Sequence, residues 1–223
     1  MESTQKIIAI LGGTGKEGKG LGYRWAKKGH KVIIGSRKLE KALDAATELN
    51  QMIGEGVVVG MDNAQAAEEA EIVVLTVPYQ AHQAMCEGIK DQVKGKIVID
   101  VTVPLVPPKV TKVQMPPAGS ASQEAQDIFG IETPVVAAFQ NISYEHLMGD
   151  SEVHCDVLVT GTGKGNRELV IGLVEDAGLT GWDAGPIENS VVVEGMTSIL
   201  IGLNKKYGIH DAGIKITGIN NVE

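Results

Sequence analysis

Short apolar runs alternate with stretches of helical periodicity between residues 6 and 138. The runs predict strands at Lys6–Leu11, Lys31–Gly35, Val57–Gly60, Ile72–Val77, Lys96–Val101 and Pro134–Ala138. The stretches between them predict helices at Lys16–Lys28, Leu39–Met52, Asn63–Glu69, Gln80–Gln92 and Ser122–Phe129. Strands that are apolar on both faces and separated by helices are typical of a parallel sheet covered on both sides. Right-handed crossovers then give an α/β, doubly wound Rossmann fold.

A second alternation begins near residue 149. It predicts a strand at Val153–Val159, a helix at Asn166–Ala177, a strand at Thr180–Ala184, a helix at Glu188–Tyr207 and a last strand at Ile214–Thr217. We therefore expect two domains. A Rossmann domain would occupy residues 1–148, and a small C-terminal α/β domain at residues 149–223 would close a cleft.

The long helix of the second section is apolar around most of its circumference, as "SVVVEGMTSILIGL" shows. A helix of this kind must be buried, and so small a section offers few neighbours. We expect the helix to pack against the first domain or against a second copy of the chain. We predict a homodimer with Ser190–Leu203 in or beside the interface.

Composition narrows the choice of partners. The formal net charge of −8 works against general binding of nucleic acid or of anionic membranes. No apolar run reaches the roughly 18 residues of a membrane span, and the first residues, "MESTQK", lack the regions of a signal peptide. The two cysteines and five histidines show no metal-ligand spacing. We expect a cytoplasmic protein that binds small molecules and no metal.

The first predicted strand runs into a glycine-rich turn that opens a helix, formed by Gly13, Thr14, Gly15, Lys16, Glu17 and Gly18. In this G-x-G-x-x-G spacing the first glycine allows the tight turn. The second lets the backbone approach a pyrophosphate, and the third lets the helix pack close to the strand. The helix N-terminus offers free N–H groups to the phosphates. The turn predicts a dinucleotide site; the alternative is a purely structural turn.

The second predicted strand ends without the acid that an NAD site normally carries there. Ser36 can donate a hydrogen bond, Arg37 can bind a phosphate bidentately, and Lys41 lies one helical turn further on. These residues favour the 2′-phosphate of NADP over the hydroxyl of NAD. In the alternative interpretation Ser36 caps the next helix and the cations are solvated.

A later glycine turn, "VLVTGTGKGNREL", lacks the third glycine in register and is predicted to be structural.

Outside the predicted dinucleotide site, few side chains are candidates for a catalytic role. The fourth predicted strand leads into Val77, Pro78 and Tyr79 at the sheet edge where ligands bind. Tyr79 either packs on a ribose or ring or caps a helix, and His82 is the one histidine expected near the cleft. The proline-rich loop at Pro104–Ser120 either borders the cleft or is a solvated connection. No general acid is evident, which is expected where cofactors carry the chemistry, so we assign no catalytic side chain.

Several stretches resemble the family of F420-dependent NADP oxidoreductases, from end to end of the chain. They are "LGGTGKEGKGLGYRWAKKGHKVIIGSRKLEKA", "VVLTVPY", "PLVP", "DAGPIENSVVVEGMTSILIGLN" and "GIHDAGIKI". The resemblance implies direct hydride transfer between NADP(H) and the 8-hydroxy-5-deazaflavin coenzyme F420, with the two rings stacked in one cleft.

The resemblance also implies roles for single residues. The turn residues Thr14–Glu17 would meet the pyrophosphate, and Val77–Tyr79 would lie beside the nicotinamide. The segment "AFQNI", which contains Ala138, Gln140 and Ile142, would line the deazaflavin pocket. The section near Ala212 and Gly213 would close it. Where the family has a histidine two residues before the pocket isoleucine, this chain has Gln140, which we expect to hydrogen-bond a ring carbonyl.

Two other functions stay open on the residues alone. One is an NADPH-dependent reductase of flavin, quinone or ferric chelate, which would use the same dinucleotide domain. The other is an NADP-binding regulator without turnover. The small closing domain and the turn at Pro78 favour an enzyme, because a regulator needs no second ring site.

Overall fold

The computed structural model describes residues 5–54 and 56–218, so most of the N-terminal stretch compared above with a signal peptide lies outside the described residues. The elements follow one another as β1 (Ile7–Leu11), α1 (Lys16–Lys27), β2 (Lys31–Ser36), α2 (Leu39–Ile53), β3 (Val58–Asp62), α3 (Asn63–Glu69), β4 (Ile72–Leu75), α4 (Tyr79–Ile89), β5 (Ile97–Asp100), α5 (Ala121–Phe129), β6 (Val135–Ala137), η1 (Tyr144–His146), β7 (Asp156–Gly161), α6 (Lys164–Asp176), β8 (Thr180–Asp183), η2 (Ile187–Asn189) and α7 (Ser190–Tyr207).

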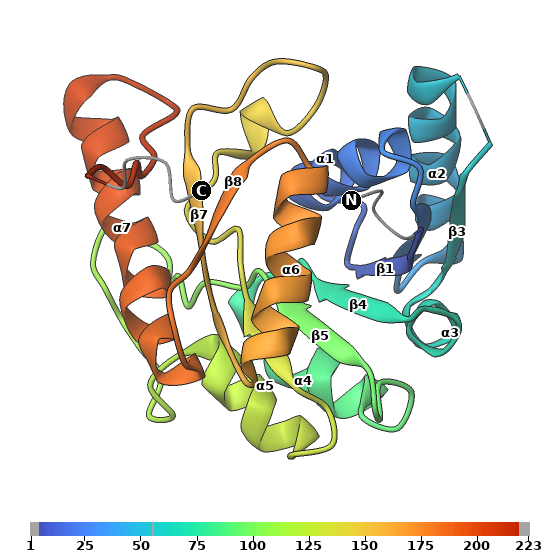
Figure 1. Ribbon diagram of the computed structural model, residues 1–223, viewed down its shortest axis with the longest axis horizontal. Coiled ribbons are helices and arrows are strands. Elements are labelled where there is room, and N and C mark those ends of the chain that lie inside the picture. Colours follow the sequence, from blue (N-terminus) through green and yellow to red (C-terminus); the bar gives the residue numbers. More distant parts are fainter. Residues whose placement is uncertain (1–4, 55, 219–223) are drawn as a thin grey trace.

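The strands form one sheet in the order β3-β2-β1-β4-β5-β6-β7-β8 (Figure 1). Strands β1 to β6 pair in parallel, β7 is antiparallel to β6, and β8 is parallel to β7. The predicted α/β doubly wound fold is confirmed. The strands of the C-terminal section continue the same sheet, and the domain boundary at residue 149 stays a prediction.

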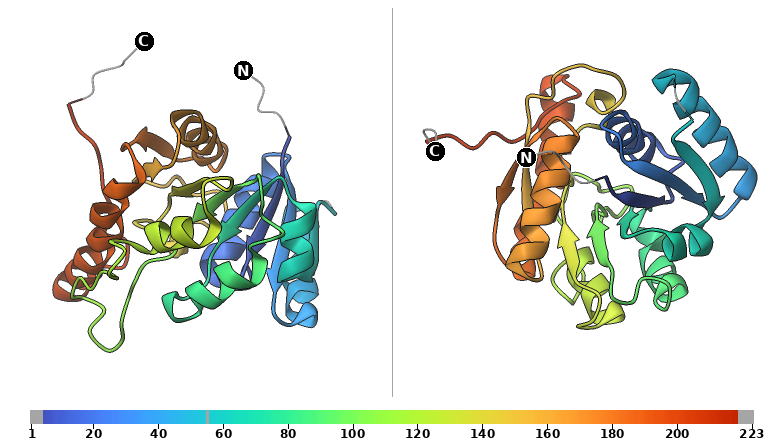
Figure 2. Two further views of the ribbon diagram at one scale, coloured as in Figure 1. Left: turned by 90° about the horizontal axis from the view of Figure 1, so that it is seen from below. Right: turned by 45° about the vertical axis from the view of Figure 1, so that its right-hand side comes forward.

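Each face of the sheet is covered by its own helices (Figure 2). Helices α1, α2 and α6 supply one core with Leu21, Trp25, Leu49 and Leu173. Helices α3, α4 and α5 supply the other core, in which Phe129 is the largest side chain. The Trp25 indole also donates a hydrogen bond to the Leu173 carbonyl at 2.8 Å. Because α6 belongs to the C-terminal section, this bond ties the two ends of the chain together.

The predicted elements agree with the structure to within a few residues, with one exception. The predicted strand at Ile214–Thr217 is wrong, because this segment is irregular and follows no sheet edge. The Ile214 carbonyl accepts one backbone hydrogen bond, from Asp156 at 2.7 Å. The next bond, from the Ile216 N–H, goes to the Asp156 carboxylate at 2.8 Å. A side chain therefore takes the place of the second rung of a ladder.

One carboxylate fixes α7 to the Rossmann section. Glu194 is fully buried and accepts hydrogen bonds from the Ala121 N–H (2.7 Å), the Ser122 N–H (3.1 Å) and the Ser122 hydroxyl (2.8 Å). It thereby satisfies the first free N–H groups of α5, which every helix N-terminus leaves open. Burial, followed by the charge of Asp100, raises the pKa of Glu194 to about 7.

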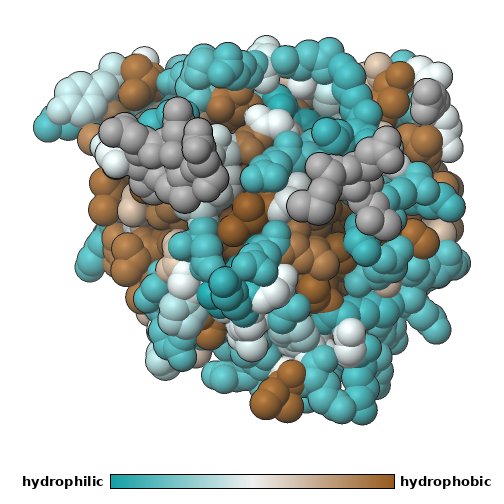
Figure 3. Space-filling model, in the orientation of Figure 1, coloured by the Kyte–Doolittle hydropathy of each residue, from teal (hydrophilic) through white to brown (hydrophobic). Residues whose placement is uncertain are grey.

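The opposite face of α7 is exposed in a single chain. Val192, Ile199 and Leu203 are 62%, 55% and 38% exposed, and they lie at helical spacing on one stripe. Apolar surface is visible over α7 at the left of Figure 3. Val113 of the proline-rich loop lies beside this stripe, since a Cβ built at Gly195 would be 3.3 Å from it. The expectation that this helix is buried all round is therefore not met within one chain.

Candidate cofactor-binding site

The glycine turn after β1 has two close contacts, at Gly13 and Gly18, and one open position, at Gly15. A Cβ built at Gly13 would lie 2.5 Å from the Ile10 carbonyl oxygen, so only glycine closes this turn. A Cβ at Gly18 would lie 2.6 Å from the Gly13 Cα and 2.9 Å from the Thr76 hydroxyl. A Cβ at Gly15 would meet only the Gly12 carbonyl, at 4.0 Å. Gly15 therefore leaves an open cradle in which a ligand can approach the backbone.

Helix α1 begins directly behind this cradle. Gly15 is its N-cap residue, and no side chain caps the helix. By contrast, Asp62 and Ser120 cap α3 and α5 through their side chains. The unpaired N–H groups and the positive end of the α1 dipole suit a phosphate. These features fit the pyrophosphate of a dinucleotide.

The end of β2 lies next to the same turn, because the Gly13 N–H donates to the Gly35 carbonyl at 3.1 Å. The Ser36 hydroxyl accepts from the Lys38 N–H at 3.2 Å. It does not cap α2, whose N-cap residue is Lys38. Arg37 and Lys41 are exposed and have no hydrogen-bond or ion-pair partner among the described side chains. Such unpaired cations fit an additional phosphate group.

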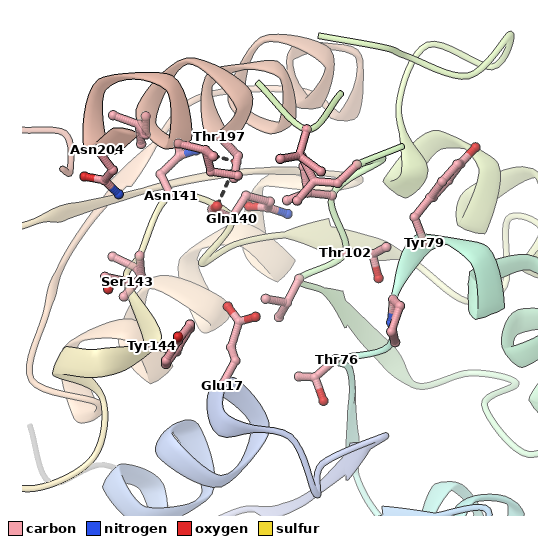
Figure 4. Close-up of a pocket in the computed structure, with 18 of the residues that line it drawn as sticks. Glu17, Thr76, Tyr79, Thr102, Gln140, Asn141, Ser143, Tyr144, Thr197 and Asn204 are labelled. Carbon is pink, nitrogen blue, oxygen red and sulfur yellow. Dashed lines mark hydrogen bonds between the residues drawn. The ribbon is translucent and has the colours of Figure 1, made fainter. Parts of the chain in front are cut away.

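A cavity of about 590 Å³ opens at the carboxyl edge of β4 and β5 (Figure 4). Of the residues predicted for the site, six line it: Glu17, Val77, Pro78, Tyr79, Gln140 and Ile142. Ala138 lies buried behind the wall, and Gly213 packs on Cys155. The other predicted turn residues, and the cations Arg37 after β2 and Lys41 in α2, do not line the cavity.

Other lining residues were not predicted one by one. The proline-rich loop borders the cavity, as one of the two alternatives had it, and α7 forms the wall that faces it; these two segments contribute Leu105, Pro107, Val110, Thr197, Leu200, Ile201 and Asn204. Ala212, which the resemblance expected near the closing side of the pocket, also lines the cavity. Their signal in the sequence is weak, because apolar residues on a helix or loop look the same whether they face a ligand or a core.

A strained residue lies directly before the cavity-lining Gln140. Phe139 has φ of 72°, a left-handed conformation that a bulky residue rarely adopts. Its ring is buried and packs edge-on against Trp25 with centroids 5.8 Å apart. This packing holds the turn that directs Gln140 and Asn141 toward the cavity. Left-handed strain at a site boundary of this kind costs on the order of 1–3 kcal/mol.

Three buried polar atoms at the cavity wall lack a hydrogen-bond partner in the described part of the chain: Thr102 Oγ1, Gln140 Oε1 and Asn141 Oδ1. The other end of the Gln140 amide donates to the Asp100 carbonyl at 2.7 Å. The Asn141 amide donates to the Val193 carbonyl (2.9 Å) and the Thr197 hydroxyl (3.0 Å). The two free oxygens are acceptors. The Gln140 oxygen is therefore suited to a ring N–H, and the expected bond from its amide to a ring carbonyl stays a prediction.

His82 does not reach the cavity. Its ring is fully buried, and Nε2 lies 2.8 Å from the Asp100 carboxylate. Burial lowers the pKa of His82, but the charge of Asp100 and the hydrogen bond to it outweigh burial and raise the pKa. The second Asp100 oxygen accepts from the Thr102 N–H at 3.0 Å. This ion pair therefore fixes the end of β5 beneath the cavity floor and has a structural role.

Tyr79 begins α4 at the cavity rim. Its hydroxyl donates to the Glu124 carboxylate at 2.9 Å, and its ring stacks on His82 with centroids 6.2 Å apart. The tyrosine is therefore both a lining residue and a link to α5. Burial, followed by the hydrogen bond to Glu124, raises the pKa of Tyr79 to about 12.

Glu17 extends from the first turn of α1 into the cavity (Figure 4). It has no hydrogen-bond or ion-pair partner among the described residues. Glu17 is half-buried, and desolvation raises the pKa of its carboxyl to about 8, which favours the neutral form at pH 7. The sequence predicted this residue only as a pyrophosphate contact.

The second glycine turn, between β7 and α6, is occupied by the protein itself. The Thr162 N–H donates to the Val135 carbonyl at 2.9 Å, and Arg167 donates to the Gly161 carbonyl at 3.0 Å. These bonds agree with its predicted structural role. Over residues 5–54 and 56–218, no group of three His, Cys, Asp or Glu side chains is placed to hold a metal, and no helix could cross a membrane.

The open glycine cradle, the bare helix end and the adjoining cavity define a Rossmann protein with a dinucleotide site and a second, ring-sized pocket. Residues 7–104 match the family described as "NADP oxidoreductase coenzyme F420-dependent". The chain is 40% identical to the F420-dependent NADP reductases of Methanocaldococcus jannaschii and Methanothermobacter marburgensis. Each match covers 95% of this chain and 98% of the relative. The chain belongs to this family of F420-dependent NADP reductases.

Solved structures agree in fold. A protein from Arthrobacter sp. FB24 that carries the provisional name F420-dependent NADP reductase has a TM-score of 0.79, 24% identity and coverage of 96% of this chain and 100% of its own. A pyrroline-5-carboxylate reductase from Coxiella burnetii has a TM-score of 0.61 and 20% identity, over 92% of this chain and 69% of its own.

Proposed function

We propose that the chain transfers a hydride directly between NADP(H) and coenzyme F420 inside the cavity beside the glycine turn. The observation that carries this proposal is that one space joins the Val77–Tyr79 wall to the Gln140–Ile142 wall. A single cofactor ring needs only one of these walls. Two flat rings stacked between them need both. The cofactors supply the hydride chemistry, and the protein supplies binding, orientation and exclusion of water.

The NADP end of the site uses backbone and cations. The bare N-terminus of α1 and the cradle at Gly15 would hold the pyrophosphate, with Thr14 and Lys16 beside it. Ser36, Arg37 and Lys41 would hold the 2′-phosphate. Pro78 ends β4 and turns the chain, so Val77 and Tyr79 would support the nicotinamide. Unpaired cations next to a turn that suits a pyrophosphate support this assignment.

The acceptor end would hold the deazaflavin against Ile142, with Ala138 behind the wall. The pyrimidine part of a deazaflavin carries a ring N–H between two carbonyls. The free oxygens of Gln140 and Asn141 are suited to the N–H, and the Thr102 hydroxyl is suited to a carbonyl.

An assay of NADPH oxidation with deazaflavin, FMN, a quinone and a ferric chelate tests the function. Turnover with FMN and none with the deazaflavin would contradict it.

We also propose that two copies pair through the exposed stripe on α7. An apolar stripe of this kind on a helix calls for a partner, and the neighbouring Val113 extends it. The cytoplasm is the proposed location, since both cofactors are charged molecules that do not cross membranes unaided.

Gly15→Val should abolish NADPH binding in a folded protein. The space around Gly15 admits a side chain without a clash in the protein, but the valine would occupy the path of the pyrophosphate. We expect calorimetry to show at least a ~100-fold weaker Kd, or about 2.8 kcal/mol. Gly165→Val is the matched control, because Gly165 also faces open space, in the structural turn. A Gly15→Val protein with normal affinity would refute the phosphate cradle.

Arg37→Ala should weaken NADPH far more than NADH. The loss of a charge-assisted bidentate contact costs roughly 1.5–3 kcal/mol, or about 10- to 150-fold in Kd. The measurement is binding of both dinucleotides to wild type, Arg37→Ala and Lys31→Ala. Lys31 is an exposed cation at the opposite end of β2 and serves as the control. Equal losses for both dinucleotides would exclude the 2′-phosphate role.

Ile142→Trp should stop deazaflavin turnover and leave NADPH affinity intact. The indole would fill the space in which the second ring stacks, and misplacement of a reactant by about 1 Å costs ~100-fold in rate. Steady-state turnover and NADPH binding are both measured. Ile131→Trp, at a site 91% exposed, is the control for a surface tryptophan. Full turnover by Ile142→Trp would place the acceptor elsewhere.

Ile199→Glu should convert a dimer into a monomer. A charge at the centre of the apolar stripe would have to be buried without a partner, which costs several kcal/mol. Sedimentation equilibrium at micromolar concentration should give twice the chain mass for wild type and for Lys205→Glu. Lys205 is an exposed cation six residues after Ile199, so it lies on a different face of α7. Wild-type protein that sediments as a monomer would contradict the pairing.

A further inference from the structure

Glu17 is the only carboxylic acid among the described residues that line the cavity. Its position is unfavourable for a charge, because it stands at the same helix end that would receive the pyrophosphate. A carboxylate there would repel the phosphates and would compete with them for the α1 dipole. The side chain nevertheless points into the cavity and contacts no described cation (Figure 4).

The surroundings of Glu17 keep a proton on it. Burial raises the pKa of Glu17 to about 8, and phosphates bound nearby would raise the pKa further. The other titratable groups that line the same cavity are Tyr144 of η1, Tyr79 of α4 and His210 of the C-terminal segment. Lys16, the adjacent cation, sits over the Tyr144 ring, 4.8 Å from its centroid. Glu17 thus carries an O–H at neutral pH where the rings would meet.

The proposed reaction needs that proton. Reduction of a deazaflavin by NADPH moves two electrons and one hydrogen as hydride, and it also consumes one H⁺. The hydride forms a C–H bond at C5 of the acceptor ring. The displaced electron pair reaches N1, which must then gain a proton. Stacked rings exclude water from this space, so a group of the protein at the cavity wall is required.

We propose that the Glu17 carboxyl donates this proton and is the catalytic acid of the reaction. The proposal rests on the hydride transfer proposed above. As the hydride arrives, the Glu17 O–H bond breaks and the ring N–H bond forms. The resulting carboxylate regains its proton from water when the site opens. In the reverse direction the Glu17 carboxylate accepts the same proton.

The other titratable groups at the cavity are less suited to this role. The Tyr79 hydroxyl is already committed to Glu124, and its raised pKa keeps the proton on it. Tyr144 and His210 are exposed at the outer rim. Tyr144 is 40% exposed, so neither group is shielded from water in the way that the step requires.

The first experiment uses no acceptor and no turnover. NADPH binding at pH 8 is measured by calorimetry in two buffers of different ionisation enthalpy, for wild type, Glu17→Gln and Glu168→Gln. Glu168 lies on α6, far from the cavity lining, and is the matched control. A carboxyl with a pKa of about 8 is half protonated at this pH. Wild type and control should take up about half a proton as the phosphates raise that pKa further, and Glu17→Gln should take up none.

The second experiment follows single-turnover reduction of the deazaflavin by bound NADPH between pH 6 and 10. Glu17 is protonated below its pKa, so the wild-type rate should be level below pH 8 and fall about tenfold per unit above it. Glu17→Gln keeps the shape and a hydrogen-bond donor but has no proton to give. Its rate should fall by roughly 100-fold or more at pH 7 and should lack the inflection near pH 8.

A wild-type rate and pH profile in Glu17→Gln would overturn the proposal. If that variant fails to bind NADPH, the carboxyl carbon resonance of Glu17 in wild type gives the decision. If the Glu17 carboxyl titrates with a midpoint near pH 8, and NADPH raises that midpoint, the role is supported. A midpoint near pH 4.5 overturns it. The proposed function fails separately, when wild type reduces FMN or a ferric chelate and leaves the deazaflavin unchanged.

Discussion

The site depends on one close contact, between the glycine turn, the first turn of α1 and the end of β4. No side chain fits at Gly18, because its Cβ would overlap the Gly13 backbone and approach the Thr76 hydroxyl. Thr76 in turn donates from both its N–H and its hydroxyl to the Leu11 carbonyl, each at 3.0 Å. The ends of β1 and β4 are thereby locked together where the strand order reverses. This contact aims the bare end of α1 at the cleft and sets Val77 on its other side.

The cavity wall across from Val77 is fixed in place by buried charged groups. Glu194 bonds α7 to the start of α5, and the His82–Asp100 pair fixes the end of β5 below Thr102. A buried carboxylate or ion pair adds little net stability, but its geometry is narrowly defined. Loss of one partner would leave the other charge buried and unpaired. The wall formed by the C-terminal section is therefore held at a fixed distance from the wall at Val77–Tyr79, and the proposed stacking of two rings would require such a fixed gap.

Local patterns predicted the fold and the geometry of the glycine turn; the phosphate contacts of this turn stay a prediction. Strands β1, β2 and β4 are apolar on both faces, and the glycine spacing is a backbone constraint that shows directly in sequence. Contacts between distant residues were not predictable. Nothing in the sequence pairs His82 with Asp100, or places Glu194, within "VVVEGM", at the start of α5. The left-handed Phe139 depends on packing against Trp25. The strand expected at Ile214–Thr217 failed because the Asp156 side chain, which no pattern marks, takes its second bond.

The charges of the cleft are divided along its length. At one end, Arg37 and Lys41 stand without acidic partners, so an acidic protein of net charge −8 still presents local cations to a phosphate. The described cavity wall carries amides, hydroxyls, apolar side chains and His210, and its one acid is Glu17 in the first turn of α1. Burial favours the neutral form of that acid near pH 7. The two cations are therefore suited to an anionic group, while the one acid of the cavity wall is neutral. Hydride transfer between two rings creates a cation on one and electron density on the other, and an uncharged wall favours neither ring before the proton moves.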